Sequence, residues 1–129
     1  MQPCFLNVDL EMESASKLDA LAVEMGKRVV VLYSGSASKP RRHLLSVECS
    51  RHYKDPNAAI QALCAAVEGL SPAARCLWRT ARKQFDVGYE LNPGERASRF
   101  SLHSDTLKRV TKLGASLAVT CYRGGTSAT

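Results

Sequence analysis

The chain has 129 residues, of which 45% are hydrophobic and 23% are charged, and its formal net charge is +6. This length fits one domain with its own hydrophobic core, and the composition excludes a disordered chain. No apolar stretch approaches the roughly 20 residues that cross a bilayer, and the N-terminus lacks the basic and apolar segments of a signal peptide. We therefore expect a single domain over residues 1–129, located in the cytoplasm and without membrane contact.

The five cysteines support this expectation. Their number is odd and no two of them have the C-x-x-C spacing, so they indicate a reducing cytoplasm rather than a disulfide framework. His43, Cys49 and His52 are close in sequence, but they lack the tight paired spacing that is typical of zinc ligands. We expect no metal and no other cofactor.

The first part of the chain predicts a strand, a short helix and a second strand. Residues 4–13 alternate between apolar and polar side chains, as expected for a strand with one buried face. Residues 14–26 predict a helix whose start is capped by Ser14 or Ser16. Residues 28–33 are a β-branched run, which is typical of an inner strand covered on both faces.

The middle of the chain predicts a hairpin followed by two helices. Residues 34–42 are rich in small residues and predict a loop, and residues 43–50 alternate again as a strand. A long helical region follows over 55–82, and Asp55 caps its start ahead of a proline. Gly69 divides this region into two helices.

The last part of the chain predicts a strand, a helix and a final strand. Residues 83–91 alternate like the first strand, and residues 92–98 form a loop. Residues 103–114 predict an amphipathic helix, residues 115–122 a closing strand, and residues 123–129 a frayed tail. The apolar stripe that this helix turns to the core consists of Leu107, Val110 and Leu113.

The resulting order of elements is β-α-β-β-α(α)-β-α-β. Its first six elements match the ferredoxin-like βαββαβ unit, with an additional helix and strand appended. We therefore predict an α+β fold, in which helices pack on one face of a mixed or antiparallel sheet of about five strands.

Acidic side chains gather on one face of this predicted sheet. Asp9, Glu11 and Glu13 alternate along the first strand, where successive members lie roughly 6.5–7 Å apart. Asp86 and Glu90 alternate in the same way on residues 83–91. If the two strands pair, both sets share an open face, and like carboxylates opposite one another destabilise a sheet. A basic counterpart must therefore come from this chain or from a partner.

These acids allow three interpretations, which are a hydrated sheet face, a docking surface and a reaction centre. Glu48 would join the same face, and no catalytic or metal-binding motif accompanies the row. A hydrated face is common in antiparallel sheets. If the face has a function, we expect a non-enzymatic module that binds a protein partner or a second copy. Bases in the predicted loops are candidates for neutralising the acids, namely Arg41, Arg42, Arg96 and Arg99.

Basic side chains suggest an alternative function, the binding of a polyanion. The candidate residues are Lys39, Arg41, Arg42, Arg75, Arg79 and Arg82. Such residues contact phosphates, but only one Trp, four Tyr and three Phe are present, and no base-stacking motif is visible. Nucleic acid is therefore a less favoured partner than protein. A second alternative is a carboxylate-based or metal-dependent enzyme.

The last strands and helix resemble a bacterial family of about 130 residues that is known only as a domain of unknown function. The residues that match its pattern are Phe85, Asp86, Gly88, Glu90, Leu113, Gly114 and Tyr122. The resemblance implies a single-domain bacterial protein of the cytoplasm with no assigned reaction. It also suggests an immunity-like role, in which the protein binds a toxin.

Overall fold

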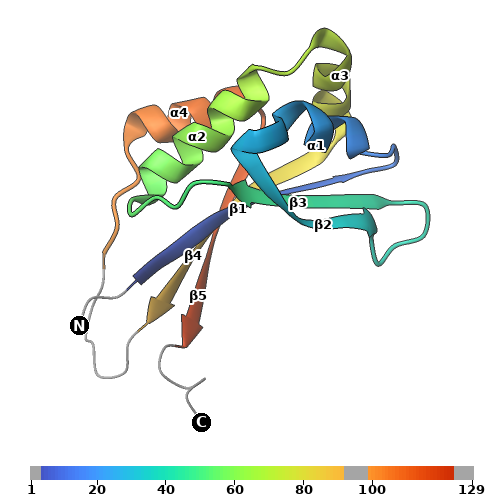
Figure 1. Ribbon diagram of the computed structural model, residues 1–129. Coiled ribbons are helices and arrows are strands. Elements are labelled where there is room, and N and C mark those ends of the chain that lie inside the picture. The colour runs from blue at the N-terminus through green and yellow to red at the C-terminus, as the bar shows by residue number, and fades with distance from the viewer. Residues whose placement is uncertain (1–3, 92–98, 124–129) are drawn as a thin grey trace.

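The computed structural model describes residues 4–91 and 99–123, and within them the strands form one sheet with helices on a single face (Figure 1). The order of elements confirms the predicted order. The elements are β1 (Cys4–Ser14), α1 (Asp19–Met25), a 3-10 turn (Gly26–Arg28), β2 (Val29–Ser36), β3 (His43–Cys49), α2 (Pro56–Glu68), α3 (Pro72–Thr80), β4 (Arg82–Leu91), α4 (Ser104–Lys112) and β5 (Ser116–Arg123).

The strand order across the sheet is β2-β3-β1-β4-β5. The first four strands are antiparallel to their neighbours, in the arrangement of the ferredoxin-like unit. β5 pairs parallel to β4, because α4 carries the chain back across the sheet between them. The predicted α+β fold, including the appended helix and strand, is confirmed.

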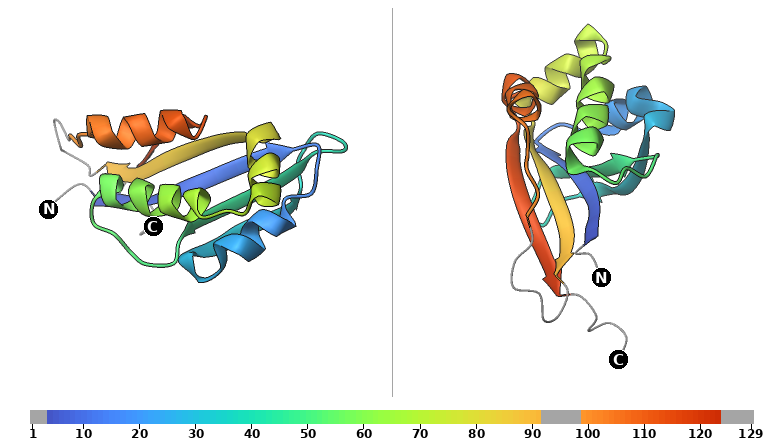
Figure 2. Two further views of the ribbon diagram at one scale, coloured as in Figure 1. Left: turned by 90° about the horizontal axis from the view of Figure 1, so that it is seen from above. Right: turned by 90° about the vertical axis from the view of Figure 1, so that its left-hand side faces the viewer.

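The hydrophobic core lies between the sheet and the helices (Figure 2). Alternation on β1 buries Leu10 and Met12 on the side that faces the helices, which we call the helix face, and β4 adds Phe85. The opposite side, which we call the open face, carries the polar members of the same alternation. Core side chains from the helices include Leu21, Met25, Ile60, Leu63, Val67, Trp78 and Val110.

A buried polar side chain attaches α4 to α2. The Asn57 amide donates to the carbonyl oxygen of Ser101 at 2.7 Å, and its oxygen accepts from the His103 backbone N–H and the Thr106 hydroxyl, both at 2.8 Å. Asn57 and Thr106 are both buried. Because a buried polar group is costly without partners, this network fixes where α4 lies.

Two predicted helices differ from the structure. The helix expected over 14–26 begins only at Asp19, because Ser14 belongs to β1 and its hydroxyl accepts from the backbone N–H of Ser16 in the connecting turn. In α4, the expected inward position of Leu107 is wrong, since its side chain is 41% exposed and Thr106 occupies the buried position. The Asn57 hydrogen bond explains this, because it favours a polar side chain on the side that faces α2.

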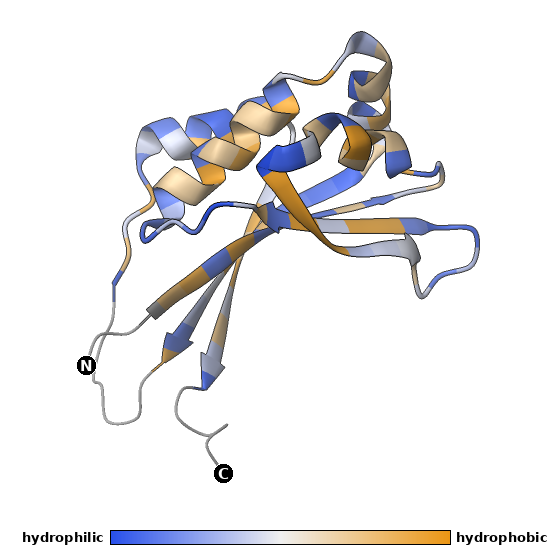
Figure 3. Cartoon of the chain, viewed as in Figure 1, coloured by the Kyte–Doolittle hydropathy of each residue, from blue (hydrophilic) through white to orange (hydrophobic). Residues whose placement is uncertain are grey.

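The prediction of an inner strand over 28–33 is also wrong. β2 lies at the edge of the sheet, and Val30, Val31, Leu32 and Tyr33 are 45–47% exposed. An uninterrupted apolar run, which Figure 3 shows at the start of β2, does not distinguish a covered strand from an exposed one. The expected loop over 34–42 is shorter than predicted, because residues 34–36 continue β2 by pairing with β3.

Replacing Asn57 with alanine tests the network between α2 and α4. The variant leaves the Thr106 hydroxyl and two backbone groups without their buried partner, so we expect the free energy of unfolding to fall by about 2–3 kcal/mol. Urea denaturation monitored by Trp78 fluorescence measures this loss. The control is Gln61→Ala on the same helix. Its contacts with Thr106 and Arg109 are only partly buried, so we expect a smaller loss. A similar small loss for both variants would contradict the role of Asn57 in fixing the position of α4.

Candidate functional site

The strand register brings the predicted acidic residues together on the open face. Asp9 lies on β1 between Glu48 on β3 and Asp86 on β4. The next polar level of β1 is Glu11, which lies between Ser46 and Gln84. Six of the twelve acids in the sequence lie on this side of the described strands, and we call this set the acidic face. Its members are Asp9, Glu11, Glu13, Glu48, Asp86 and Glu90.

Neutral side chains hold the central carboxylates in place. The Asn7 amide donates to both Asp9 and Glu48, each at 2.7 Å, and so bridges two strands. The Thr120 hydroxyl on β5 lies 2.8 and 3.0 Å from the two oxygens of Asp86. Because an amide and a hydroxyl carry no net charge, these bonds orient the carboxylates without neutralising them.

The effect of the clustered carboxylates on a pKa is clearest at Asp9. Partial burial, followed by the neighbouring carboxylates of Glu48, Glu11 and Asp86, raises the pKa of Asp9 from 3.8 to about 6. The hydrogen bond from Asn7 acts in the opposite direction and lowers the pKa. The centre of the face therefore has a negative potential that its own donors do not cancel.

At one end of the acidic face, basic residues offset the negative charge of the acids. Arg42 from the β2–β3 loop forms an ion pair with Glu13 at 3.1 Å, as expected for a loop base that neutralises the row. Arg82 on β4 lies opposite Glu13 in the register. Arg41 and Arg99 are exposed, and a further candidate, Arg96, lies outside the described residues.

The predicted polyanion-binding residues lie on three different elements and are interleaved with acids. Arg79 and Arg82 line one hollow of about 540 Å³, but Glu11 and Glu13 line it too. Arg75 donates to the backbone oxygen of Glu68. The remaining bases, Lys39, Arg41 and Arg42, belong to the loop between β2 and β3. The mixture of charges weakens the case for polyanion binding.

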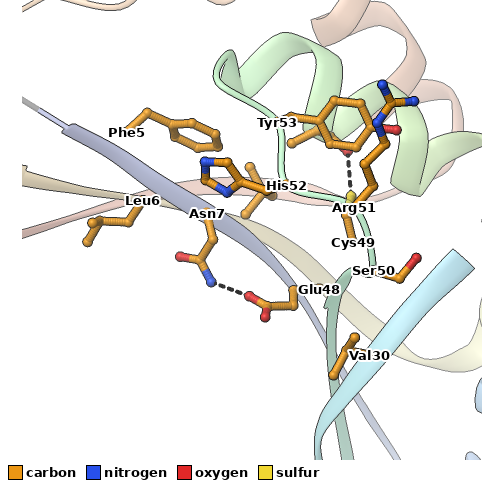
Figure 4. A pocket seen from close by; sticks show the side chains of 12 residues that line it. Phe5, Leu6, Asn7, Val30, Glu48, Cys49, Ser50, Arg51, His52 and Tyr53 are labelled. Carbon is orange, nitrogen blue, oxygen red and sulfur yellow. Dashed lines mark hydrogen bonds between the residues drawn. The ribbon is translucent and has the colours of Figure 1, made fainter.

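A second hollow, of about 370 Å³, lies at the other end of the acidic face, where β1 and the chain after β3 separate. Figure 4 shows the Asn7–Glu48 hydrogen bond on one side of it and the rings of Phe5, His52 and Tyr53 on the other. The hollow therefore combines a carboxylate with aromatic surfaces. The carboxylate and the Phe5 ring can attract a cationic side chain, whereas the Tyr53 ring already has the guanidinium of Arg51 over it, 5.6 Å from the ring centroid.

Two residues of this site were not predicted from the sequence. Asn7 shares the alternation of Asp9 and Glu11, so the sequence predicts which side of the strand it lies on. Its hydrogen bond to Glu48 can be predicted only when the pairing of β1 with β3 is known. The Thr120 contact with Asp86 required the parallel pairing of β4 with β5. Neither pairing follows from one sequence.

The described residues offer little for other site chemistries. Across residues 4–91 and 99–123, no three His, Cys, Asp or Glu side chains are arranged to hold a metal ion. In the same part of the chain, no helix has the length and hydropathy needed to cross a bilayer. No family model matches the chain, and neither does any curated protein or solved structure.

The fold gives identifiable roles to several residues of the last strands and helix. Phe85 is fully buried in the core. At Gly88, a Cβ atom would lie 3.2 Å from the Asn7 side-chain oxygen and 3.4 Å from the Tyr122 ring, so only glycine fits without a shift. Gly114 has a φ of +74°, which glycine adopts readily after a helix.

Replacing Asp9 with asparagine tests the cost of ionising Asp9 in the folded protein, which arises from partial burial and from the neighbouring carboxylates. Asparagine retains an oxygen that accepts from Asn7 but carries no charge. Because the folded protein raises the pKa of Asp9 from 3.8 to about 6, ionisation disfavours the fold above that range and not below it. We therefore expect the variant to be more stable by about 0.5–1 kcal/mol at pH 7.5, with the gain falling between pH 6 and pH 4.

Urea denaturation at several pH values measures the difference between the variant and the natural sequence. Asp105→Asn is the matched control, because it removes an exposed acid from the first turn of α4. The control should give no gain, since an acid at a helix N-terminus is favourable. A stability gain for Asp9→Asn that does not depend on pH would contradict a cost of ionising Asp9 in the folded protein.

Proposed function

We propose that the protein is a non-enzymatic interaction module whose acidic face binds a basic protein partner. The observation that carries the proposal is the central cluster of Asp9, Glu48 and Asp86, which is held by neutral donors on a sheet face without a helix layer. A complementary charge on a partner would remove a repulsion that the chain itself leaves in place. Such complementarity favours association and specificity.

A basic partner suits this face better than a second copy of the same face. Two copies stacked symmetrically would bring two sets of carboxylates together, which costs free energy when both sets are ionised. The hollow beside Glu48 adds the Phe5 ring as an aromatic surface for a lysine or arginine side chain. A basic toxin bound by an immunity-like protein is one partner of this chemistry.

Removing acids from the face should weaken the binding of a cationic probe. The test variant is Glu11→Gln with Asp86→Asn, and the probe is a fluorescein-labelled decalysine peptide. We expect the dissociation constant to rise roughly fivefold at low salt, since each surface charge contributes at most about 1 kcal/mol. Fluorescence anisotropy measures the change, and added salt should reduce the difference between the variants.

The matched control is Asp19→Asn with Asp105→Asn, which changes the net charge by the same amount on other surfaces. Both residues are exposed on helices. The control variant should bind the peptide almost as well as the natural sequence. Equal weakening of both variants would show that only net charge matters, and the proposal would be wrong.

A further inference from the structure

Within residues 4–91 and 99–123, no strand pairs with the outer edge of β5. β5 is the last strand of the sheet, and its register with β4 is continuous on the inner side. Ser116 to Tyr122 contains no charged residue, proline or glycine. Val119 and Tyr122 are 54% and 50% exposed. Natural proteins protect edges with charges, prolines, bulges or covering segments, because unpaired backbone groups bind other strands.

The other edge of the sheet, β2, is better protected. Its register shifts between Val31 and Tyr33, which bends the strand away from regular pairing. The Tyr33 hydroxyl donates to the backbone oxygen of Ser36, and the Ser34 hydroxyl lies 3.5 Å from the Asp19 carboxylate. These features make β5 the edge that is more suited to pairing.

The helix above β5 extends the exposed surface. The side of α4 that carries Thr106 and Arg109 contacts α2. With 3.6 residues per turn, Leu107 and Thr111 lie on another side of the helix, turned away from α2. Figure 2 shows that α4 lies over the β5 edge, outside α2. The Thr111 hydroxyl donates to the Leu107 backbone oxygen, so these two residues offer apolar contact, and Lys108 and Lys112 border them on the same surface.

The size of this surface favours an occupant with two layers. A strand of eight residues is about 26 Å long, and a helix layer about 10 Å above it widens the surface. The area is on the order of 500 Å² per partner, which is less than the roughly 800 Å² of a standard interface. A single peptide strand would cover β5 and leave Leu107 exposed. A second copy brings a strand and a helix in the same arrangement.

We propose that β5 pairs in antiparallel orientation with β5 of a second copy, with α4 packed against its counterpart across the two-fold axis. The sheet then continues through both copies. The acids nearest the axis are Asp86 and its counterpart, which stand three strand spacings apart, about 14 Å, so salt largely screens their repulsion. The acidic faces remain uncovered and lie side by side. This dimer does not depend on the function proposed for them.

Sedimentation velocity at increasing protein concentration tests the dimer. We expect the natural sequence to form a reversible dimer with a dissociation constant on the order of 10–100 µM, because the interface is small. Val119→Lys places a charge at the edge and should weaken the dimer at least tenfold. Leu107→Lys should weaken it too, and its exposed position on α4 leaves the sheet unchanged.

The matched control is Val30→Lys, which changes an equally exposed valine on the β2 edge and should leave the dimer intact. Circular dichroism verifies that each variant is folded. If Val119→Lys unfolds, Leu107→Lys still decides the outcome. A natural sequence that stays monomeric at about 1 mM, ten times the weakest affinity expected, would overturn the proposal. So would a dimer that Val30→Lys disrupts and Leu107→Lys does not.

Discussion

The helices cover one face of the sheet, and the apolar side chains of the central strands are buried between the two layers. Because successive side chains of a strand point to opposite faces, every buried residue on β1 places a neighbour on the open face. Leu10 and Met12 thus position Asp9, Glu11 and Glu13. A shift of one residue in register would bury these acids, so the core that stabilises the fold also keeps the acidic face exposed.

The acidic face and the β5 edge are two consequences of the same architecture. A two-layer fold leaves one sheet face without a cover, and an open sheet leaves two edges. On the uncovered sheet face, the chain places carboxylates that are held by Asn7 and Thr120. At the edges, it bends β2 with a register shift and leaves β5 in regular register. Pairing through β5 would align two acidic faces and so offer a basic partner a longer surface.

Local signals in the sequence predicted the helices and strands well. Features that depend on how these elements pack together could not be predicted. Asp55 and Ser71 cap α2 and α3 as their positions before proline suggest, and period-two alternation placed the acids of β1 on one side. The exposure of Val30 and Leu107 was not readable, because an apolar residue on an edge strand has the same local pattern as one in the core. Buried Thr106 was missed because its partner, Asn57, lies on another helix.

We propose that a basic partner binds the open face. The most direct measurement is a titration of the ¹⁵N-labelled protein with decalysine, followed through backbone amide shifts at pH 7.5. We expect saturable shifts at Asn7, Asp9, Glu48 and Asp86, which decrease with added salt. Shifts confined to α3 and α4, or no saturable shifts on β1, β3 and β4, would contradict it.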